Sequence, residues 1–306
     1  MMELLSGILG TDAARILAPI WLVAYGTQIA GFAISAPLQT EKPVSLFSAS
    51  EHTYPPTTFP ITPPPPPRYH PRQIIATTLQ TVWSLRLAIF LGSRVFRKGG
   101  DARFEKVKRK PGLFLIFWLG QALWIFLIPL GVYGVNALPP ELHPPIGLTD
   151  MFGVALWFFG ISFEAIADAQ KSAFSKDPKN HGKFITNGLW RISRHPNYFG
   201  EIILWAGMTL FCTPALLKIS RSYPERIKPA VAYSTLVSPI FLTYLLNMVS
   251  GINILEKMGD KRWGNLKEWK EYKETTPVLV PWIGWWWMNK MKKDVKAAGG
   301  THEKNK

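Results

Sequence analysis

Long apolar segments recur along the chain and alternate with charged loops. A helical span needs about 20 apolar residues, at a rise of about 1.5 Å per residue. Segment 277–288 is too short to span, and its run Trp285 to Trp287 reads as an interfacial anchor. The pattern predicts an all-α, polytopic membrane bundle of about six spans, within a range of five to seven. We place them at residues 13–35, 73–97, 113–136, 148–168, 199–219 and 230–252.

Composition divides the chain into three parts. Residues 1–72 hold the first span and a connector with five consecutive prolines, Pro63 to Pro67, which extend about 15 Å as polyproline II. Residues 73–288 form one membrane domain, and 289–306 form a basic C-terminal tail.

The net charge of +15 is unevenly distributed. With six spans, loops 98–112 and 170–198 and the tail after 252 share one side and carry 24 Lys and Arg residues, against seven on the other side. The positive-inside rule then places the basic loops and both termini in the cytoplasm. Topogenic charge explains the excess, so we expect the lipid bilayer, and no nucleic acid, as partner.

The N-terminus and the cysteine content add two expectations. The chain starts Met-Met-Glu without a basic n-region, so we expect the first apolar stretch to remain as a helix. The absence of a targeting segment and the cytoplasmic bias of charge fit a location in the endoplasmic reticulum. The single cysteine, Cys212, rules out an intramolecular disulfide and a cysteine zinc cage, and we expect no metal site.

The segment from Arg194 to Glu201, RHPNYFGE, concentrates polar groups where a basic loop meets an apolar span. Unsatisfied polar groups are costly at that boundary. Pro196 indicates that the next helix starts near Asn197, which makes Asn197 a candidate N-cap. A capped helix explains part of the cluster. Cations beside a helix N-terminus also form an anion site suited to phosphate, which favours a ligand site.

Further polar residues lie within the spans. Arg86 should face a cavity or a partner, and pairing with Glu164 is one structural explanation. Glu164 and Asp168 are four residues apart and share a helix face. Asp168 and Lys171 lead into the basic loop, which favours a function for Asp168.

Several blocks resemble the steroid 5-alpha-reductase C-terminal superfamily, closest to its uncharacterised "domain of unknown function" branch. They are WSLRLAIFLGSRVFRKGGDARF at 83–104, GISFEAIADAQKSAF at 160–174, GLWRISRHPNYFGEIILWAG from 188, and the tail around LKEWKEYKETTPVLVPW. Their order and number cover most of the chain beyond residue 72.

The resemblance implies a membrane reductase that uses NADPH to reduce a C=C bond of a lipid or steroid-like enone, a hydrophobic small molecule. Asp168, Asn197 and Glu201 match cofactor-lining residues, and Lys183 matches a basic residue before the Gly-Leu-aromatic turn. Arg or Lys can neutralise the cofactor phosphates, and Asn can bond its carboxamide. The catalytic proton donor stays unassigned. The remaining residues placed in the cofactor site are Lys171, Arg191, Arg194, His195 and Tyr198.

Two other functions stay open. The isoprenylcysteine carboxyl methyltransferases share an Arg-His-Pro-x-Tyr-x-Gly motif and a tail that Glu256, Glu271-Tyr272 and Pro281 fit in part. S-adenosylmethionine would then replace NADPH. A non-catalytic lipid-binding protein that keeps the pocket is the third alternative.

Overall fold

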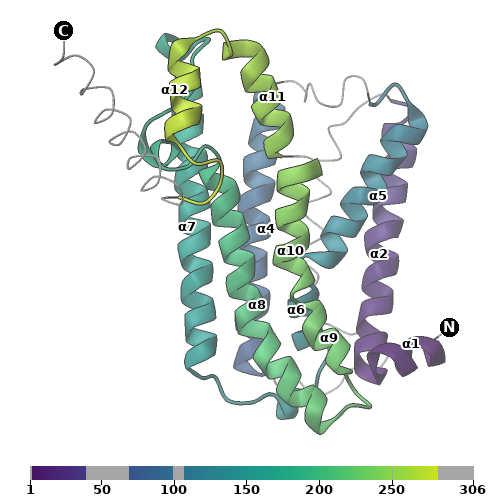
Figure 1. Ribbon diagram of the computed structural model, residues 1–306. Coiled ribbons are helices and arrows are strands. Elements are labelled where there is room, and N and C mark those ends of the chain that lie inside the picture. Colours follow the sequence, from purple (N-terminus) through teal and green to yellow (C-terminus); the bar gives the residue numbers. More distant parts are fainter. Residues whose placement is uncertain (1, 39–68, 99–106, 250, 282–306) are drawn as a thin grey trace, which may run out of the picture. The chain divides into compact units, whose positions relative to one another are not determined.

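The computed structural model describes residues 2–38, 69–98, 107–249 and 251–281, and these form helices and turns without a strand among them (Figure 1). The all-α prediction is confirmed. The α-helices are α1 (Met2–Leu9), α2 (Thr11–Ser35), α4 (Pro71–Lys98), α5 (Pro111–Leu127), α6 (Leu130–Asn136), α7 (Leu148–Lys176), α8 (Pro196–Ser222), α9 (Pro229–Ser234), α10 (Val237–Tyr244), α11 (Ile252–Trp263) and α12 (Lys267–Thr275).

Five helices in this part of the chain are long and apolar enough to cross a membrane, or six if one bent pair forms a span. The bent pair is α5 and α6, which the sequence predicts as one helix over 113–136. Pro129 separates them, and their axes differ by 48°. The last predicted span is also segmented, into α9, α10 and a π-helical turn at Leu245–Val249. Five spans, or six with the bent α5–α6 pair, fit the predicted range.

Proline sets where several helices begin. Helices α4, α5, α8 and α9 all start at a proline, at Pro71, Pro111, Pro196 and Pro229. The first helical position suits proline because its fixed φ is helical and the missing N–H has no intrahelical acceptor there. The predicted start near Asn197 is therefore confirmed within one residue. The predicted cap is wrong: Phe199 N–H bonds the His195 carbonyl, so His195 is the capping residue and Asn197 lies inside the first turn.

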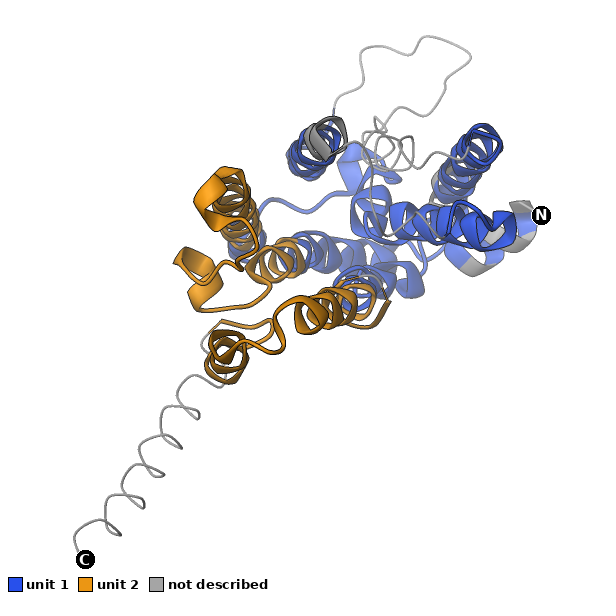
Figure 2. Cartoon of the chain, turned by 90° about the horizontal axis from the view of Figure 1, so that it is seen from above, with its two compact units in different colours: residues 1–155, 205–242 blue, residues 156–204, 243–306 orange. Residues whose placement is uncertain are grey.

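The chain divides into two compact units, residues 1–155 with 205–242 and residues 156–204 with 243–306 (Figure 2). The boundaries fall inside α7, α8 and α10. The predicted division at residues 72 and 288 stays a prediction. Its connector and tail (39–68 and 289–306) and the interfacial anchor beyond residue 281 lie outside the described residues.

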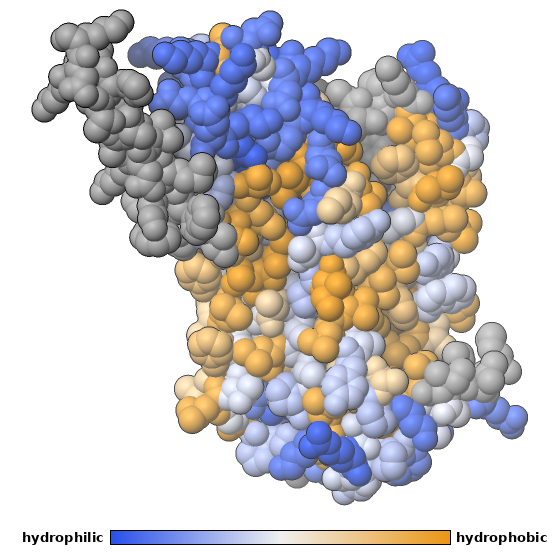
Figure 3. Space-filling view, in the orientation of Figure 1, coloured by the Kyte–Doolittle hydropathy of each residue, from blue (hydrophilic) through white to orange (hydrophobic). Residues whose placement is uncertain are grey.

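In the first unit, α2 packs along α5, and Phe32 and Ala36 pack against a core of Val107, Phe114 and Trp118. The outward faces of α2 and α5 are hydrophobic, as expected of helices in contact with lipid (Figure 3).

A buried ion pair fixes the start of α4 in the same unit. The Arg72 guanidinium binds both carboxylate oxygens of Asp150 and donates to the Phe211 carbonyl at 3.1 Å. It also donates to the carbonyls of Pro144 and Pro145 at 3.4 Å. The segments 69–72, 137–150 and 211 therefore meet in one place. This contact places the end of the predicted 37–72 loop beside the 137–147 loop. The start of the 37–72 loop follows Ala36, which packs against the Val107 core at the far end of α2, so the prediction that the whole loop lies on one side is not supported.

The N-terminal helices contradict one part of the predicted topology. Backbone N–H groups of Thr11 and Asp12 donate to the carbonyls of Glu225 and Arg226, and Lys228 N–H donates to Leu9. Segments joined by backbone hydrogen bonds lie on the same side of a bilayer. The prediction that the N-terminus lies opposite the 218–229 loop is therefore wrong. The number of spans and the charge of the loops could not reveal this pairing, because residues 9–12 and 225–228 are distant in sequence.

Candidate functional site

The second unit brings together α7 and α8 at very close range. A Cβ at Gly200 would lie 2.6 Å from the Glu164 backbone nitrogen, and one at Gly160 would lie 2.4 Å from the Leu204 nitrogen. Only glycine permits this approach. The close packing lets the short Asn197 side chain on α8 reach α7, where its Nδ2 donates to Asp168 Oδ1 at 3.2 Å.

Aromatic residues fold the loop between α7 and α8 onto α12. Trp190 is buried, and its indole N–H donates to the Ala167 carbonyl at 3.1 Å. The Tyr272 hydroxyl donates to the Trp190 carbonyl at 2.6 Å. Burial raises the pKa of Tyr272, so this hydroxyl keeps its proton and acts as a donor. Trp190 thus ties the loop to α7 through its side chain and to α12 through its carbonyl.

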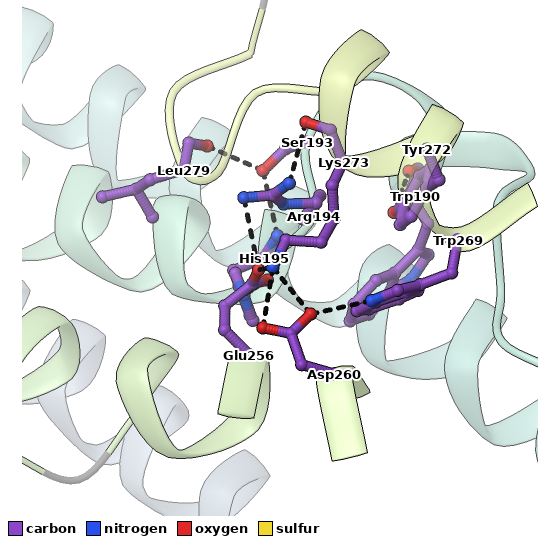
Figure 4. A network of polar contacts seen from close by, with 10 residues as sticks. All are labelled: Trp190, Ser193, Arg194, His195, Glu256, Asp260, Trp269, Tyr272, Lys273 and Leu279. Carbon is purple, nitrogen blue, oxygen red and sulfur yellow. Dashed lines mark hydrogen bonds and ion pairs between the residues drawn. The ribbon is translucent and has the colours of Figure 1, made fainter. Parts of the chain in front are cut away.

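A network of charged groups lies beside this turn (Figure 4). Glu256 on α11 accepts from His195 Nε2 at 3.0 Å and pairs with Arg194 Nη2 at 3.3 Å. Arg194 Nη1 donates to the Lys273 carbonyl at 2.9 Å. The Lys273 ammonium lies 3.6 Å from Glu256 and 2.7 Å from Asp260. Residues from the α7–α8 loop, α11 and α12 therefore share one electrostatic centre.

His195 is a neutral member of that network. Burial lowers its pKa, and the hydrogen bond and charge of Glu256 offset part of that effect. A neutral ring that faces a carboxylate carries its proton on Nε2. The Tyr198 ring stacks on it with centroids 5.6 Å apart and planes 9° apart. The permanent positive charge beside Glu256 comes from Arg194 and Lys273.

The nine predicted site residues all lie in the second unit, but they do not form one cluster. The structure joins Asp168 to Asn197, and it links Arg194, His195 and Tyr198 through Glu256 and ring stacking. Glu201 is half-buried one turn after Asn197. The remaining cations are exposed: Lys171, whose ammonium lies 4.6 Å from the Trp190 ring centroid, Lys183 and Arg191.

A cleft of about 360 Å³ opens at the end of α7. Gly188, with φ of +58°, makes room for the Gln170 amide, which lies 2.5 Å from where a Cβ would be. Gln170 Oε1 in turn accepts from Leu189 N–H at 2.9 Å. The other lining residues are Ala173, Phe174, Asp177, Asn180 and Asn187.

Sequence reasoning missed the central position of Glu256 and the contributions of Asp260 and Lys273. Glu256 entered only as part of a methyltransferase-like tail, and that block was the one available signal. Lys273 and Asp260 lie in a strongly charged segment where nothing in the pattern separates a site residue from a solvated one. Among the described residues, no group of three or more His, Cys, Asp or Glu side chains could hold a metal ion.

A comparison with known protein families finds one match that covers most of the chain. A family described as "Protein of unknown function (DUF1295)" matches residues 31–276. The chain belongs to this family. The match includes the Asp168–Asn197 pair, the Arg194 segment, Glu256 and Lys273, so the DUF1295 region contains the whole candidate site. This match confirms part of the resemblance predicted from the sequence. The family is one of unknown function, and it is related to the sterol reductases.

Individual relatives of this DUF1295 protein are distant. An uncharacterized protein of Schizosaccharomyces pombe is 29% identical over 171 residues, which are 46% of this chain and 48% of the relative. A Delta(14)-sterol reductase of Ascobolus immersus is 32% identical over 111 residues, covering 31% and 25%. A probable O-methyltransferase of Ustilaginoidea virens is 34% identical over 58 residues, covering 19% and 20%. The chain thus spans less than half the length of each relative. No solved structure matches it.

Proposed function

We propose that this protein is a membrane-embedded, NADPH-dependent reductase of a C=C bond in a lipid or sterol-like enone. Support comes from distant sterol reductase relatives together with a site that offers the chemistry such a cofactor needs. A hydrophobic substrate would fit both these relatives and a protein whose long apolar helices can cross a bilayer.

The observation that carries the proposal is the hydrogen bond from Asn197 to Asp168. A carboxylate only accepts, so the Asn197 nitrogen must face it and the amide oxygen is left for another donor. A carboxamide such as that of nicotinamide presents an NH₂ donor of this kind. The buried Asp168 acts as a positioning residue that fixes which end of the Asn197 amide is offered.

The cations of the same unit suit the rest of the cofactor. Lys171, Lys183 and Arg191 are exposed, and Arg194 lies beside the first turn of α8. Guanidinium and ammonium groups bind phosphate through charge-assisted hydrogen bonds, and a helix N-terminus adds to the attraction. When bound, the reduced nicotinamide supplies a hydride to the electron-poor double bond. His195, Tyr198 and Glu201 complete the proposed lining.

A second function has one specific observation in its favour. The O-methyltransferase relative is similar over 58 residues, and Glu256 contacts both Arg194 and His195 of the motif shared with membrane methyltransferases. In that case S-adenosylmethionine would take the place of NADPH.

Thermal stabilisation of the purified protein in detergent distinguishes the two. A ligand that binds only the folded state stabilises it by about 2.7 kcal/mol at a hundredfold excess over Kd. We expect a rise in Tm with NADPH, a smaller one with NADH, and none with S-adenosylmethionine. Stabilisation by S-adenosylmethionine alone would overturn the reductase. No response to any of the three would favour a non-catalytic lipid-binding protein.

The location that we propose is the endoplasmic reticulum, with the second unit's polar loops and the C-terminus in the cytoplasm, where NADPH is supplied. Hydrophilic residues gather over α11 and α12, as this orientation requires (Figure 3). The basic loops support it through the positive-inside rule.

A further inference from the structure

Glu256 is surrounded by more cationic groups than one carboxylate needs. Arg194 lies 3.3 Å and Lys273 3.6 Å from Oε2, while His195 bonds Oε1. Asp260 holds the same Lys273 ammonium at 2.7 and 2.9 Å. Two permanent cations thus converge on a carboxylate that is 16% exposed.

The same carboxylate lies beside the first turn of a long helix. Its partner His195 is the capping residue of α8, so Glu256 occupies the end where the helix dipole favours negative charge. The surrounding groups also have unused capacity. Arg194 is 92% buried, since 8% of it is exposed, and its Nε has no hydrogen-bond acceptor among the described residues. A buried guanidinium with an unmet donor indicates a site that can accept one more oxygen.

We propose that Glu256 occupies an anion subsite formed by Arg194, Lys273 and the first turn of α8, and that a phosphate group binds there by displacing this carboxylate. The inference deepens the proposed function, since it names the place where a phosphate of the cofactor would bind. It also holds for any phosphate of similar reach, including that of an anionic lipid headgroup.

The charges explain why phosphate can compete. A phosphate carries three or more acceptor oxygens and more negative charge than a carboxylate, and it can bond Arg194 through two N–H groups at once. Lys273 stays in place when Glu256 leaves, because Asp260 continues to hold it. Glu256 lies on α11 and can turn its carboxylate toward solvent without breaking a backbone bond. In the absence of phosphate, the Glu256 carboxylate reduces the repulsion between Arg194 and Lys273.

Glu256→Gln is the decisive variant. It retains the shape and an acceptor for His195 but removes the competing charge. We expect it to bind inorganic pyrophosphate about tenfold more tightly than the wild type, a change of about 1.4 kcal/mol, by isothermal titration in detergent. Asp260→Asn is the matched control. It neutralises a carboxylate one turn away that holds the Lys273 ammonium in place and accepts from the Trp269 indole, so it loosens Lys273 without vacating the subsite, and we expect no gain. Arg194→Gln should abolish pyrophosphate binding.

The alternative hypothesis, that Glu256 has a purely structural role, predicts a different result. If Glu256 only holds the loop in place, Glu256→Gln loosens Arg194 and weakens pyrophosphate binding. Weaker or unchanged binding in a variant with wild-type helicity by circular dichroism would overturn the inference.

The wild-type protein provides a measurement that does not depend on the folding of any variant. Saturating pyrophosphate should reduce acylation of Lys273 severalfold, read by mass spectrometry. The exposed Lys267 and Lys270 on the same helix serve as internal controls. Equal acylation of Lys273 with and without pyrophosphate would refute the subsite.

Two further arms identify the source of the phosphate. Short-chain phosphatidic acid in mixed micelles tests a lipid headgroup, and NADPH tests the cofactor; whichever protects Lys273 at the lower concentration is the ligand. The two hypotheses remain separable. Pyrophosphate binding with the expected response to Glu256→Gln, but no binding of NADPH, sinks the reductase alone. NADPH binding that Glu256→Gln leaves unchanged sinks the subsite alone.

Discussion

Asn197 donates a hydrogen bond to Asp168 across 3.2 Å, and this bond joins the first turn of α8 to the later turns of α7. It exists because two glycines bring the helices close enough for an asparagine side chain to span the gap. The bond turns the Asn197 nitrogen toward Asp168, so the amide oxygen faces away from that carboxylate.

Removing either member of the pair should weaken the binding of NADPH. We expect Asn197→Ala and Asp168→Ala each to raise the Kd about tenfold, because a hydrogen bond to a charged or oriented partner contributes about 1.5 kcal/mol. Asp168→Ala acts by releasing the Asn197 amide. Titration of NADPH followed by fluorescence energy transfer from tryptophan measures the Kd.

Asn253→Ala is the control for this pair, because Asn253 is exposed and its side chain contacts the Met248 sulfur at 3.9 Å. It should bind NADPH as the wild type does. Wild-type affinity in both Asn197→Ala and Asp168→Ala would show that the pair is structural.

The sequence was sufficient for the spans and for one side of the site. Hydrophobic length located α2, α4, α7 and α8, and Pro196 located the start of α8, because these signals are local. Glu256 and Lys273 were not predicted as partners of Arg194, since they approach it from 62 and 79 residues away. No local pattern encodes such a contact. The pairing of residues 9–12 with 225–228 was missed for the same reason.

Close packing of α7 and α8 makes Gly200 sensitive to any added atom. We expect Gly200→Ala to destabilise the protein by about 1–3 kcal/mol, because the new Cβ meets backbone atoms that cannot rotate away. It should also lengthen the Asn197–Asp168 contact and weaken NADPH binding. Thermal unfolding in detergent measures the loss in stability.

Gly120 in α5 provides the comparison, since a Cβ added there would have no other atom within 4 Å among the described residues. Gly120→Ala should be neutral or should stabilise by up to about 1 kcal/mol, through helix propensity. Equal Tm values for the two variants would mean that α7 and α8 can separate at little cost.

The bonds between residues 9–12 and 225–228 predict the side on which the N-terminal helix lies. Cys212 is fully buried, so single cysteines can be introduced without removing it. We expect Gly7→Cys and Glu225→Cys to react with a membrane-impermeant maleimide from the same side of sealed vesicles. Arg109→Cys should react from the opposite side, because α2 starts beside Glu225 and its last turn packs against the Val107 core. Labelling of Gly7→Cys and Arg109→Cys from one side would contradict this topology.

His143 should make the first unit sensitive to acid. It stacks on His70 with ring centroids 5.1 Å apart, outside the spans. Burial lowers its pKa to about 4, and the charges of His70 and Arg72 act in the same direction. In the unfolded chain the pKa is about 6.5, so the unfolded state takes up the proton first as pH falls. The contribution of neutral His143 to the free energy of unfolding is therefore fully present above about pH 6.5. It is lost as pH falls toward 4, by on the order of 2 to 3 kcal/mol.

His143→Phe keeps the stacked ring and removes the titration, so its Tm should fall less than that of the wild type between pH 7 and pH 4.5. His181→Phe, at an exposed histidine of the second unit, should retain the wild-type slope. The comparison is made as a difference in slope, because carboxylates throughout the protein contribute equally to all three curves. Parallel curves for His143→Phe and the wild type would show that the buried imidazole does not govern the acid response. A flatter curve for His143→Phe alone would attribute the response to this histidine, since the two substitutions are identical and differ only in burial.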